Sequence, residues 1–533
     1  MRSLIGAQKR SPAAGNWKYK LQLFLLFAVF LISVCALVYQ LLAGTISSYL
    51  VGDSVYQFSL VIGMFVSSMG LGSFLSRYIN KQLHDWFILV ELLTGVTGGM
   101  SAIVLFLAFS HIENYTPFLI MVSVGIGTLV GLELPIILRI VKEHNTLKIV
   151  LSNVMTADYA GALFASLLFP IILVPQLGLI RTSLTFGLMN VAVASAALYV
   201  FRERIIARKG LITLAATSML LLATCFVFAG HISSFAEDKL YSDEIIYTAN
   251  TPYQRVVVTK TRNDVRMFIN GSIQFSSQDE YRYHEALVLP AMSSAHSRRN
   301  VLVIGGGDGL AAREILKFSD VEKLLIVDID PAITDFARDN QMMRALNLDS
   351  MRHPKTRIVN DDAWKFLEKD PDLYDVIIID LPDPDDLTLS RLYSRSFYRL
   401  LAGKLARGGK IVTQATSPLY ANKAFWCIYN TMRATENPLY KSELASETIC
   451  LEAEAYSCYV PSFGSWGFVM ASNTPIQWDK IRIEVASRFV NTDFIKVMNV
   501  FSPDIQHIDT EINTIDTHAV KSYYEEGWER WAL

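Results

Sequence analysis

The sequence predicts a multi-span α-helical membrane domain followed by an α/β doubly wound sheet, with a small antiparallel β lead-in between them. Charge density separates the two parts: residues 21–230 hold 18 charged side chains in 210 positions, and residues 231–533 hold 75 in 303. Only the second density is typical of a soluble domain. Apolar stretches of spanning length recur in the first part, and short apolar strands alternate with helices in the second.

The small net charge of −2 hides two parts of opposite sign. Residues 1–230 have 15 basic and 8 acidic side chains (+7), whereas residues 231–533 have 33 and 42 (−9). An acidic second part excludes a basic nucleic-acid binder, so we expect no nucleic-acid partner. Five cysteines without a CxxC pair exclude a disulfide framework and a zinc or redox site of that spacing. We therefore expect no metal.

Residues 1–20 form a basic tail, and residues 21–230 are expected to form seven transmembrane helices. The run that begins at Leu21 is too long for a signal-peptide core and lacks a clear cleavage site, so it is expected to stay as a span. Each apolar stretch is long enough to cross a hydrocarbon core of about 30 Å as a helix. The expected spans are 21–43, 54–76, 86–109, 117–140, 155–176, 179–201 and 211–230.

The loops between these spans alternate in charge. The tail and the second, fourth and sixth loops hold 14 Lys and Arg residues, and the opposite side holds only Arg181. This bias places the N-terminus in the cytoplasm of a multi-pass plasma (inner) membrane protein, with the lipid bilayer as a partner. Seven spans then place residues 231–533 outside the cytoplasm. One miscounted span would reverse that placement.

Three carboxyl side chains, Glu91, Glu133 and Asp158, lie within the apolar spans. A carboxylate in hydrocarbon is costly, so each is expected to face the bundle interior, to be protonated or to meet a cation. Two explanations stay open: a structural hydrogen bond or a position near the interface, and a path for a cation or polyamine.

After residue 230 the pattern changes to short strands. Residues 231–290 are expected to form the β-rich lead-in, with Asn270-Gly271 as a turn between strands. Residues 291–533 are expected to form the doubly wound sheet with a C-terminal extension. Its predicted strands are 301–304, 324–327, 357–359, 376–379 and 410–414.

Glycines and acids follow four of these strands, where parallel α/β sheets bind ligands. The first strand ends in Gly305-Gly306-Gly307-Asp308-Gly309, the second in Asp328, the third in Asp362 and the fourth in Asp380. A carboxylate about 20 residues after the glycine turn commonly accepts from ribose hydroxyls. An acid in the glycine turn would repel a pyrophosphate but attract a sulfonium or ammonium group. The pattern therefore favours an adenosyl sulfonium ligand over a dinucleotide.

Several further segments resemble the spermidine synthase (polyamine aminopropyltransferase) family. They are residues 269–274, 279–285 and 301–309, Asp362-Ala363, and Asp380-x-x-Asp383-Pro384. The match covers about residues 245–475, and the whole chain resembles the membrane-fused branch of the family. The resemblance implies a Rossmann-like, methyltransferase-type fold. It also implies a small polyamine as substrate, decarboxylated S-adenosylmethionine as co-substrate, and a homodimer.

The resemblance assigns roles to residues by position. Asp380 would be the catalytic acid that takes the proton of the attacking amine. The co-substrate would be bound by Gln274, His284, Gly305, Gly307, Asp308, Asp328 and Asp362, with Asp308 on its ammonium group, Asp328 on ribose and Asp362 on adenine. The amine acceptor would be bound by Tyr283, Asp383, Gln414 and Phe463.

Two departures from the family pattern bear on the acceptor. Leu381 and Pro382 replace hydroxyl-bearing residues, and Phe463 stands where soluble members often have a tyrosine. The expected reaction converts putrescine to spermidine, or a related amine, and releases methylthioadenosine. Two alternatives stay open: an S-adenosylmethionine-dependent N-methyltransferase, and a polyamine transporter or sensor whose second domain only binds.

Cys450 and Cys458 flank a strand-like stretch. We expect two buried free thiols there. A disulfide between them is the alternative in an oxidising compartment.

Overall fold

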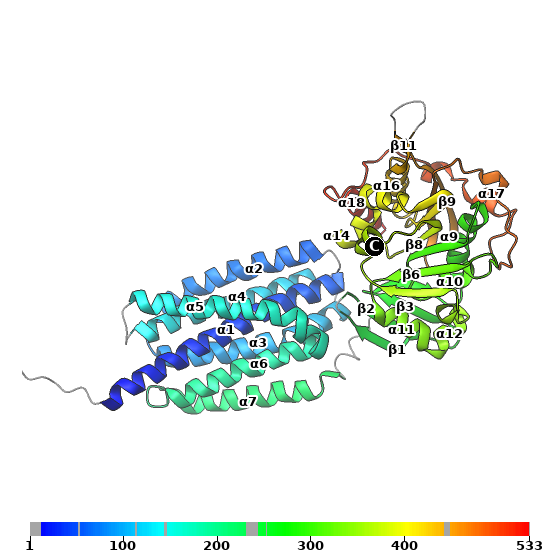
Figure 1. The fold of residues 1–533 in the computed structure, drawn as a ribbon. Coiled ribbons are helices and arrows are strands. Elements are labelled where there is room, and N and C mark those ends of the chain that lie inside the picture. Colours follow the sequence, from blue (N-terminus) through cyan, green and yellow to red (C-terminus); the bar gives the residue numbers. More distant parts are fainter. Residues whose placement is uncertain are drawn as a thin grey trace, which may run out of the picture. The chain divides into compact units, whose positions relative to one another are not determined.

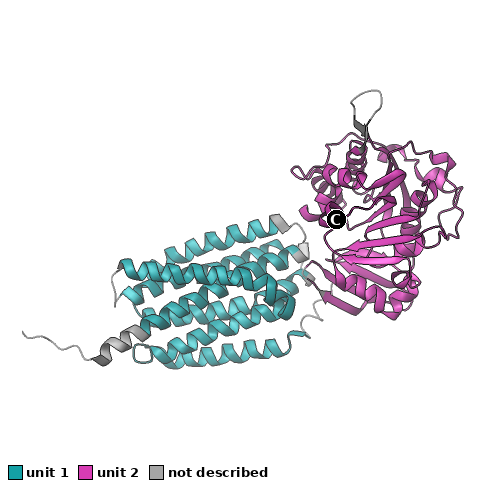
Figure 2. Ribbon diagram, in the orientation of Figure 1, with its two compact units in different colours: residues 1–242 teal, residues 243–533 magenta. Residues whose placement is uncertain are grey.

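The structure, a computed structural model, describes residues 12–51, 54–111, 115–142, 147–230, 243–251, 253–441 and 448–531. The chain divides into two compact units, residues 1–242 and residues 243–533 (Figure 2). The sequence predicted a boundary after residue 230, whereas the division falls after residue 242. The residues between the two, 231–242, lie outside the described residues. Most of the expected basic tail, residues 1–11, lies outside them as well.

Unit 1 consists of long apolar helices that lie side by side (Figure 1). Among the described residues, six stretches are long and apolar enough to cross a membrane, whereas the sequence predicted seven spans. The difference lies in Lys148–Val200, a single stretch of 53 residues that contains two of the expected spans. The helices are α1 (Pro12–Val51), α2 (Ser54–Leu75), α3 (Leu83–His111), α4 (Thr116–Lys142), α5 (Leu147–Leu168), α6 (Val174–Val200) and α7 (Arg208–Val227).

The 53-residue stretch is interrupted at Gly178. Its backbone angles, φ 72° and ψ 175°, are not helical and are accessible mainly to glycine. A π-helical turn, Phe169–Leu173, precedes this break. The break separates α5 and its π turn from Leu179–Val200, so the long stretch contains two helical segments.

Glycines allow α2 and α4 to pack closely. A Cβ atom on Gly72 would lie 2.1 Å from the Thr128 carbonyl oxygen, and one on Gly131 would lie 2.1 Å from the Met69 carbonyl oxygen. Such contacts are possible only without side chains, as is common where membrane helices associate.

Unit 2 begins with a four-stranded antiparallel sheet in the order β1-β2-β3-β4. Asn270 and Gly271 have φ values of 50° and 87° and form the turn between β3 and β4, as a two-residue hairpin requires. The strands are β1 (Glu244–Asn250), β2 (Arg255–Lys260), β3 (Val265–Ile269) and β4 (Ser272–Ser276). The expected β-rich range extended to residue 290, but its last part is helical, because helix α9 (Glu280–Ser294) begins at Glu280.

The main sheet has seven strands in the order β12-β13-β9-β8-β5-β6-β7. The five strands from β9 to β7 pair in parallel, and they contain all five strands predicted for this sheet. The sheet is nevertheless mixed, because β12 and β13 add an antiparallel hairpin at one edge. The strands are β5 (Asn300–Gly305), β6 (Lys323–Asp328), β7 (Thr356–Asn360), β8 (Tyr374–Asp380), β9 (Leu405–Gln414), β12 (Glu452–Val460) and β13 (Gly464–Ser472).

Apolar side chains alternate between the two faces of this sheet, as the two-residue period of a strand requires. In β5, Val301 and Val303 belong to a core that includes helix α9, whereas Leu302 and Ile304 belong to a second core on the other face. That second core includes α15 (Arg395–Ala402) and α16 (Asn422–Arg433). Helix α18 (Ala519–Glu529), in the C-terminal extension, also contributes Ala519 and Val520 to it.

Cys450 and Cys458 are both free thiols, as expected. Cys458 is buried in β12 as predicted, but the prediction that Cys450 is also buried is wrong, because that residue is exposed. Cys450 ends the short strand β11 (Thr448–Cys450), and Cys458 lies opposite Trp466 of β13.

Candidate active site

The candidate site lies where the connections of the main sheet reverse direction. The chain passes from β5 outward to β6 and β7, and then returns to place β8 on the other side of β5. Ligands of open α/β sheets bind at such a switch point, at the carboxyl ends of the strands. A cavity of about 460 Å³ opens there, lined by Gly305 of β5 and by Asp380 of β8, which pair directly in the sheet.

The glycine turn after β5 has no room for side chains. A Cβ atom on Gly305 would lie 2.1 Å from the Asp380 carbonyl oxygen, and one on Gly307 would lie 2.5 Å from a carboxylate oxygen of Asp328. Gly305 also has a φ of 77°. The glycines therefore let the turn lie against two of the predicted acids, and Gly307 N–H donates to Asp328 Oδ2 at 3.1 Å.

Three predicted residues come together at one point of the cavity. His284, Asp308 and Asp380 each place one nitrogen or oxygen atom within 4.8 Å of the other two. The Tyr283 hydroxyl donates to Asp380 Oδ1 at 2.8 Å. Burial raises the pKa of Asp380, although the charge of His284 and the hydrogen bond from Tyr283 oppose this shift.

The same balance acts on Asp308. Burial raises its pKa to about 6, against the opposing charge of His284, and the neighbouring Asp380 raises it further. Two carboxyls this close are stable together only when a cation or a proton lies between them. By distance alone the group could hold a metal ion, and by charge it could hold an organic cation.

His284 is held as a cation by a buried ion-pair network. Its Nδ1 lies 2.9 Å from Glu280 Oε2, and Arg313 Nη2 donates to the same oxygen at 2.9 Å. Burial alone would lower the pKa of His284, but the hydrogen bond and charge of Glu280 raise it to about 9. The imidazolium therefore offsets part of the negative charge of the cavity.

Asp328 and Asp362, the acids predicted to hold the nucleoside, both line the cavity, and each already has protein partners. Burial raises the pKa of Asp328 to about 6, while its Oδ1 accepts from the Asp330 N–H at 2.8 Å. Asp362 Oδ1 caps helix α13 (Ala363–Lys369) by accepting from the Trp364 and Lys365 N–H groups. Its Oδ2 accepts from Arg391 at 2.5 Å.

A second group of polar side chains surrounds Asp383. Gln414 Nε2 donates to Asp383 Oδ1 at 3.2 Å, and Thr416 Oγ1 donates to Asp383 Oδ2 at 3.4 Å. Burial raises the pKa of Asp383 to about 6, although hydrogen bonds from Gln414, Tyr524 and Thr416 oppose this shift. Nearby, burial and the charge of Asp386 raise the pKa of Asp385 to about 7.

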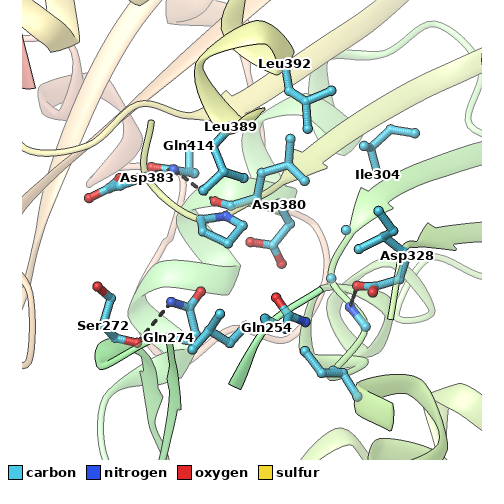
Figure 3. Close-up of a pocket in the computed structure, with 18 of the residues that line it drawn as sticks. Gln254, Ser272, Gln274, Ile304, Asp328, Asp380, Asp383, Leu389, Leu392 and Gln414 are labelled. Atoms are coloured by element: carbon cyan, nitrogen blue, oxygen red, sulfur yellow. Dashed lines mark hydrogen bonds between the residues drawn. The ribbon is translucent and has the colours of Figure 1, made fainter. Parts of the chain in front are cut away.

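The remaining predicted residues line other walls of the cavity. Gln274 lies on β4, on the opposite side of the cavity from Asp380 and Asp383, and its amide donates to the Ser272 carbonyl at 3.1 Å (Figure 3). Phe463 follows β12, and its ring packs edge-to-face on Tyr283 with centroids 5.8 Å apart. All twelve predicted site residues therefore line a single cavity.

The cavity also contains residues that the sequence did not indicate. Tyr524 comes from α18, more than 100 residues beyond the last predicted strand end. Gln254 precedes β2, and Arg391 follows the fourth predicted strand end by eleven residues. Tyr393 is fully buried and does not line the cavity itself, but its hydroxyl donates to the carbonyl of the lining residue Pro382 at 2.8 Å. A sequence signal existed only for Tyr393 and Arg391, which lie near the acids of the fourth strand end.

This arrangement favours a ligand with several positive charges. Several half-buried carboxyls line the cavity, and its apolar and aromatic walls strengthen their attraction for a cation. A carboxylate with a raised pKa can also accept a proton near neutral pH. The geometry thus fits proton transfer from a bound amine.

Comparisons with known proteins agree with this chemistry. The spermine/spermidine synthase domain model matches residues 280–479. A polyamine aminopropyltransferase of Leptospira interrogans is 42% identical over 513 residues, 96% of this chain and 99% of the relative. Polyamine aminopropyltransferase 2 of Ralstonia nicotianae is 40% identical and covers 95% and 98%, and a polyamine aminopropyltransferase of Mycobacterium tuberculosis is 34% identical and covers 99% and 100%.

Among solved structures, spermidine synthase in complex with the transition-state analogue AdoDATO is 22% identical, with a TM-score of 0.42 over 49% of this chain and 85% of that chain. The full-length relatives decide the assignment, because they match both units and not only the α/β unit. The chain belongs to the spermidine synthase (polyamine aminopropyltransferase) family and is an aminopropyltransferase.

Proposed function

We propose that this enzyme is membrane-bound and moves the aminopropyl group of decarboxylated S-adenosylmethionine to a di- or polyamine, such as putrescine, and releases methylthioadenosine. The observation that carries the proposal is the pair of carboxyls at the switch point, Asp308 and Asp380, which lie beside the glycine turn and beside His284. One carboxyl can hold the ammonium group of the co-substrate while the other receives the proton of the acceptor.

Asp380 is the proposed catalytic residue. An amine attacks carbon only when it is neutral, so a carboxylate must orient the amine and take its proton as the carbon–sulfur bond breaks. The Tyr283 hydroxyl, 2.8 Å from Asp380 Oδ1, fixes the orientation of that carboxylate. The electron pair of the broken carbon–sulfur bond stays on sulfur, which loses its positive charge. The nitrogen that forms the new carbon–nitrogen bond loses its proton to Asp380.

The nucleoside side of the proposed site is formed by the glycine turn and the acids that follow β6 and β7. Gly305 and Gly307 let the turn lie against Asp380 and Asp328. Asp328, which lines the cavity, would accept from the ribose hydroxyls. Asp362 is placed for the adenine amino group, with its carboxylate oriented by Arg391. Gln274 and His284 complete this side. We expect no metal there, because an organic ammonium and a sulfonium supply the positive charge.

The acceptor side is formed by Tyr283, Asp383, Gln414 and Phe463, together with Tyr524. Asp383 is placed for the far ammonium group of the acceptor. This carboxylate keeps three hydrogen-bonding partners although Phe463 supplies no hydroxyl.

A direct test is to assay the purified chain for methylthioadenosine release with decarboxylated S-adenosylmethionine and a panel of amines. The proposal expects amine-dependent release that is unaffected by a chelator. Amine-dependent conversion of S-adenosylmethionine to S-adenosylhomocysteine, without methylthioadenosine, would instead indicate an N-methyltransferase. Binding without either product would indicate a sensor or transporter. The comparisons do not favour these two alternatives.

The membrane proposal rests on the apolar helices of unit 1 and on the charge bias of their loops. With the break at Gly178, the described residues of the unit contain seven long apolar helices, and an odd number of spans places the two ends on opposite sides of a bilayer. We therefore place unit 2 outside the cytoplasm. A reporter that works only in the cytoplasm, fused after Leu533, should be inactive.

The proposed homodimer is tested by light scattering on the detergent-purified chain.

A further inference from the structure

Unit 1 contains a buried polar cluster that the proposed reaction does not use. Glu91 and Thr94 lie on one face of α3, and three other helices bring a polar side chain to that face: Tyr39 from α1, Glu133 from α4 and Asn190 from α6. All five side chains are at most 1% exposed.

Glycines on the same face of α3 bring the neighbouring helices close. A Cβ atom on Gly98 would lie 2.4 Å from the ring of Tyr39, and one on Gly95 would lie 3.1 Å from Asn190 Cβ. Gly95 and Gly98 follow Glu91 by four and seven residues, the spacing of one helix face. Tyr39 and Asn190 therefore pack on the stripe of α3 that carries Glu91.

The cluster has hydrogen-bond acceptors without donors. Neither carboxyl oxygen of Glu91 has a partner. Glu133 Oε1 accepts from the Thr94 hydroxyl at 2.7 Å, but its Oε2 has no partner. Asn190 Nδ2 donates to the Tyr39 hydroxyl at 3.4 Å, while its carbonyl Oδ1 has no partner. A buried acceptor without a donor is costly, and a buried carboxylate without a cation is more so.

We infer that Glu91, Glu133 and Asn190 form a binding site for an ammonium group. Such a group supplies up to three N–H donors and one positive charge, and the unpartnered oxygens of the cluster are acceptors from three different helices. The ammonium ion and the charged end of an aliphatic amine share this chemistry. Protons could neutralise the two acids. The Asn190 carbonyl carries no charge to neutralise, but it still needs a hydrogen-bond donor. The inference is independent of the proposed reaction, because no residue of unit 2 takes part.

The test is equilibrium binding of radiolabelled methylammonium to the full chain, purified in detergent. Every sample carries Asp383→Asn, so that amine binding in the catalytic cavity is weakened equally. Glu91→Gln should weaken methylammonium binding at least about tenfold, as expected when a charged acceptor is lost. The matched control is Thr97→Val on α3, because Thr97 is exposed and its hydroxyl bonds to the Leu93 carbonyl of its own helix. This control should bind like the parent.

Competition on the Asp383→Asn chain, with Glu91 unchanged, keeps the test valid if Glu91→Gln does not fold. Ammonium should displace the label, whereas tetramethylammonium, which has no N–H donor, should not. Displacement by sodium at the same concentrations would overturn the ammonium assignment. Absence of saturable binding, which is the result expected if the carboxyls only hold protons, would overturn the site. Stronger displacement by 1,4-diaminobutane than by ammonium would identify an aliphatic amine as the source of the group.

Discussion

Replacement of Tyr524 by phenylalanine should impair use of the amine without affecting the nucleoside. The Tyr524 hydroxyl forms a hydrogen bond with Asp383, the carboxyl that we propose binds the far ammonium group. A hydrogen bond to a charged group contributes roughly 1.5–3 kcal/mol, and each 1.4 kcal/mol is about tenfold in an equilibrium constant. Tyr524→Phe should therefore lower kcat/KM for the amine by about ten- to a hundredfold.

The loss of this hydrogen bond also changes the titration of Asp383. The bond lowers the pKa of Asp383, which lies at about 6, so its removal raises that pKa. A carboxyl with a raised pKa is ionised only above it, and its attraction for the ammonium is lost as the pH falls through that value. The acid limb of kcat/KM for the amine should consequently move to higher pH in Tyr524→Phe.

The assay is methylthioadenosine release at varied amine and at varied co-substrate. Tyr523→Phe is the matched control, because Tyr523 is adjacent but its ring lies 5.7 Å from the Lys423 ammonium, outside the cavity lining. The affinity for methylthioadenosine should be the same in both variants and in the parent. Equal amine efficiency in Tyr524→Phe and Tyr523→Phe would refute the role of Tyr524.

Four further changes test the other parts of the site. Asp380→Asn should reduce methylthioadenosine release by at least about a thousandfold, because the amide cannot take the proton, with nucleoside binding by calorimetry retained; turnover within a few-fold of the parent would remove Asp380 from its role. Asp308→Asn should weaken binding of decarboxylated S-adenosylmethionine more than that of methylthioadenosine, which lacks the ammonium, and equal losses would contradict this. Tyr283→Phe should move the acid limb of kcat/KM to higher pH, because the hydroxyl lowers the pKa of Asp380; an unmoved limb in a pH series counts against it. Phe463→Tyr should favour short diamines by about tenfold, and an unchanged ranking of putrescine, cadaverine and longer amines would show that Phe463 does not face the acceptor.

The site residues at the strand ends could be predicted from the sequence, because their position follows from the alternation of strands and helices in a parallel sheet. Each parallel strand ends at the same edge of the sheet, so Asp328, Asp362 and Asp380 must converge once the strands are identified. The direct pairing of Gly305 with Asp380 shows this convergence at the level of single residues.

Contacts between distant segments could not be predicted in this way. Tyr524 reaches the cavity because α18 packs against the core that contains α16, and no pattern in the sequence fixes that docking. The division at Gly178 coincides with the boundary expected between the spans 155–176 and 179–201. The π turn could not be predicted, because hydropathy records apolar length but not the hydrogen-bond pattern of a single turn. The exposure of Cys450 depends likewise on the two-stranded sheet formed by β10 (Glu436–Lys441) and β11.

The electrostatics of the cavity link substrate binding to proton release. Burial raises the pKa of Asp308, Asp328 and Asp383 to about 6 in the free enzyme, and it raises that of Asp380 as well. A bound ammonium or sulfonium stabilises the ionised carboxylates and so lowers these values. By linkage, a cation should bind to this cavity more weakly as the pH falls through 6, because protons must then be displaced from the carboxyls. His284, held as a cation by Glu280, limits this effect by keeping part of the carboxylate charge compensated before the substrates arrive. Near neutral pH the cavity should therefore bind a cation more strongly than a neutral or anionic ligand of the same shape.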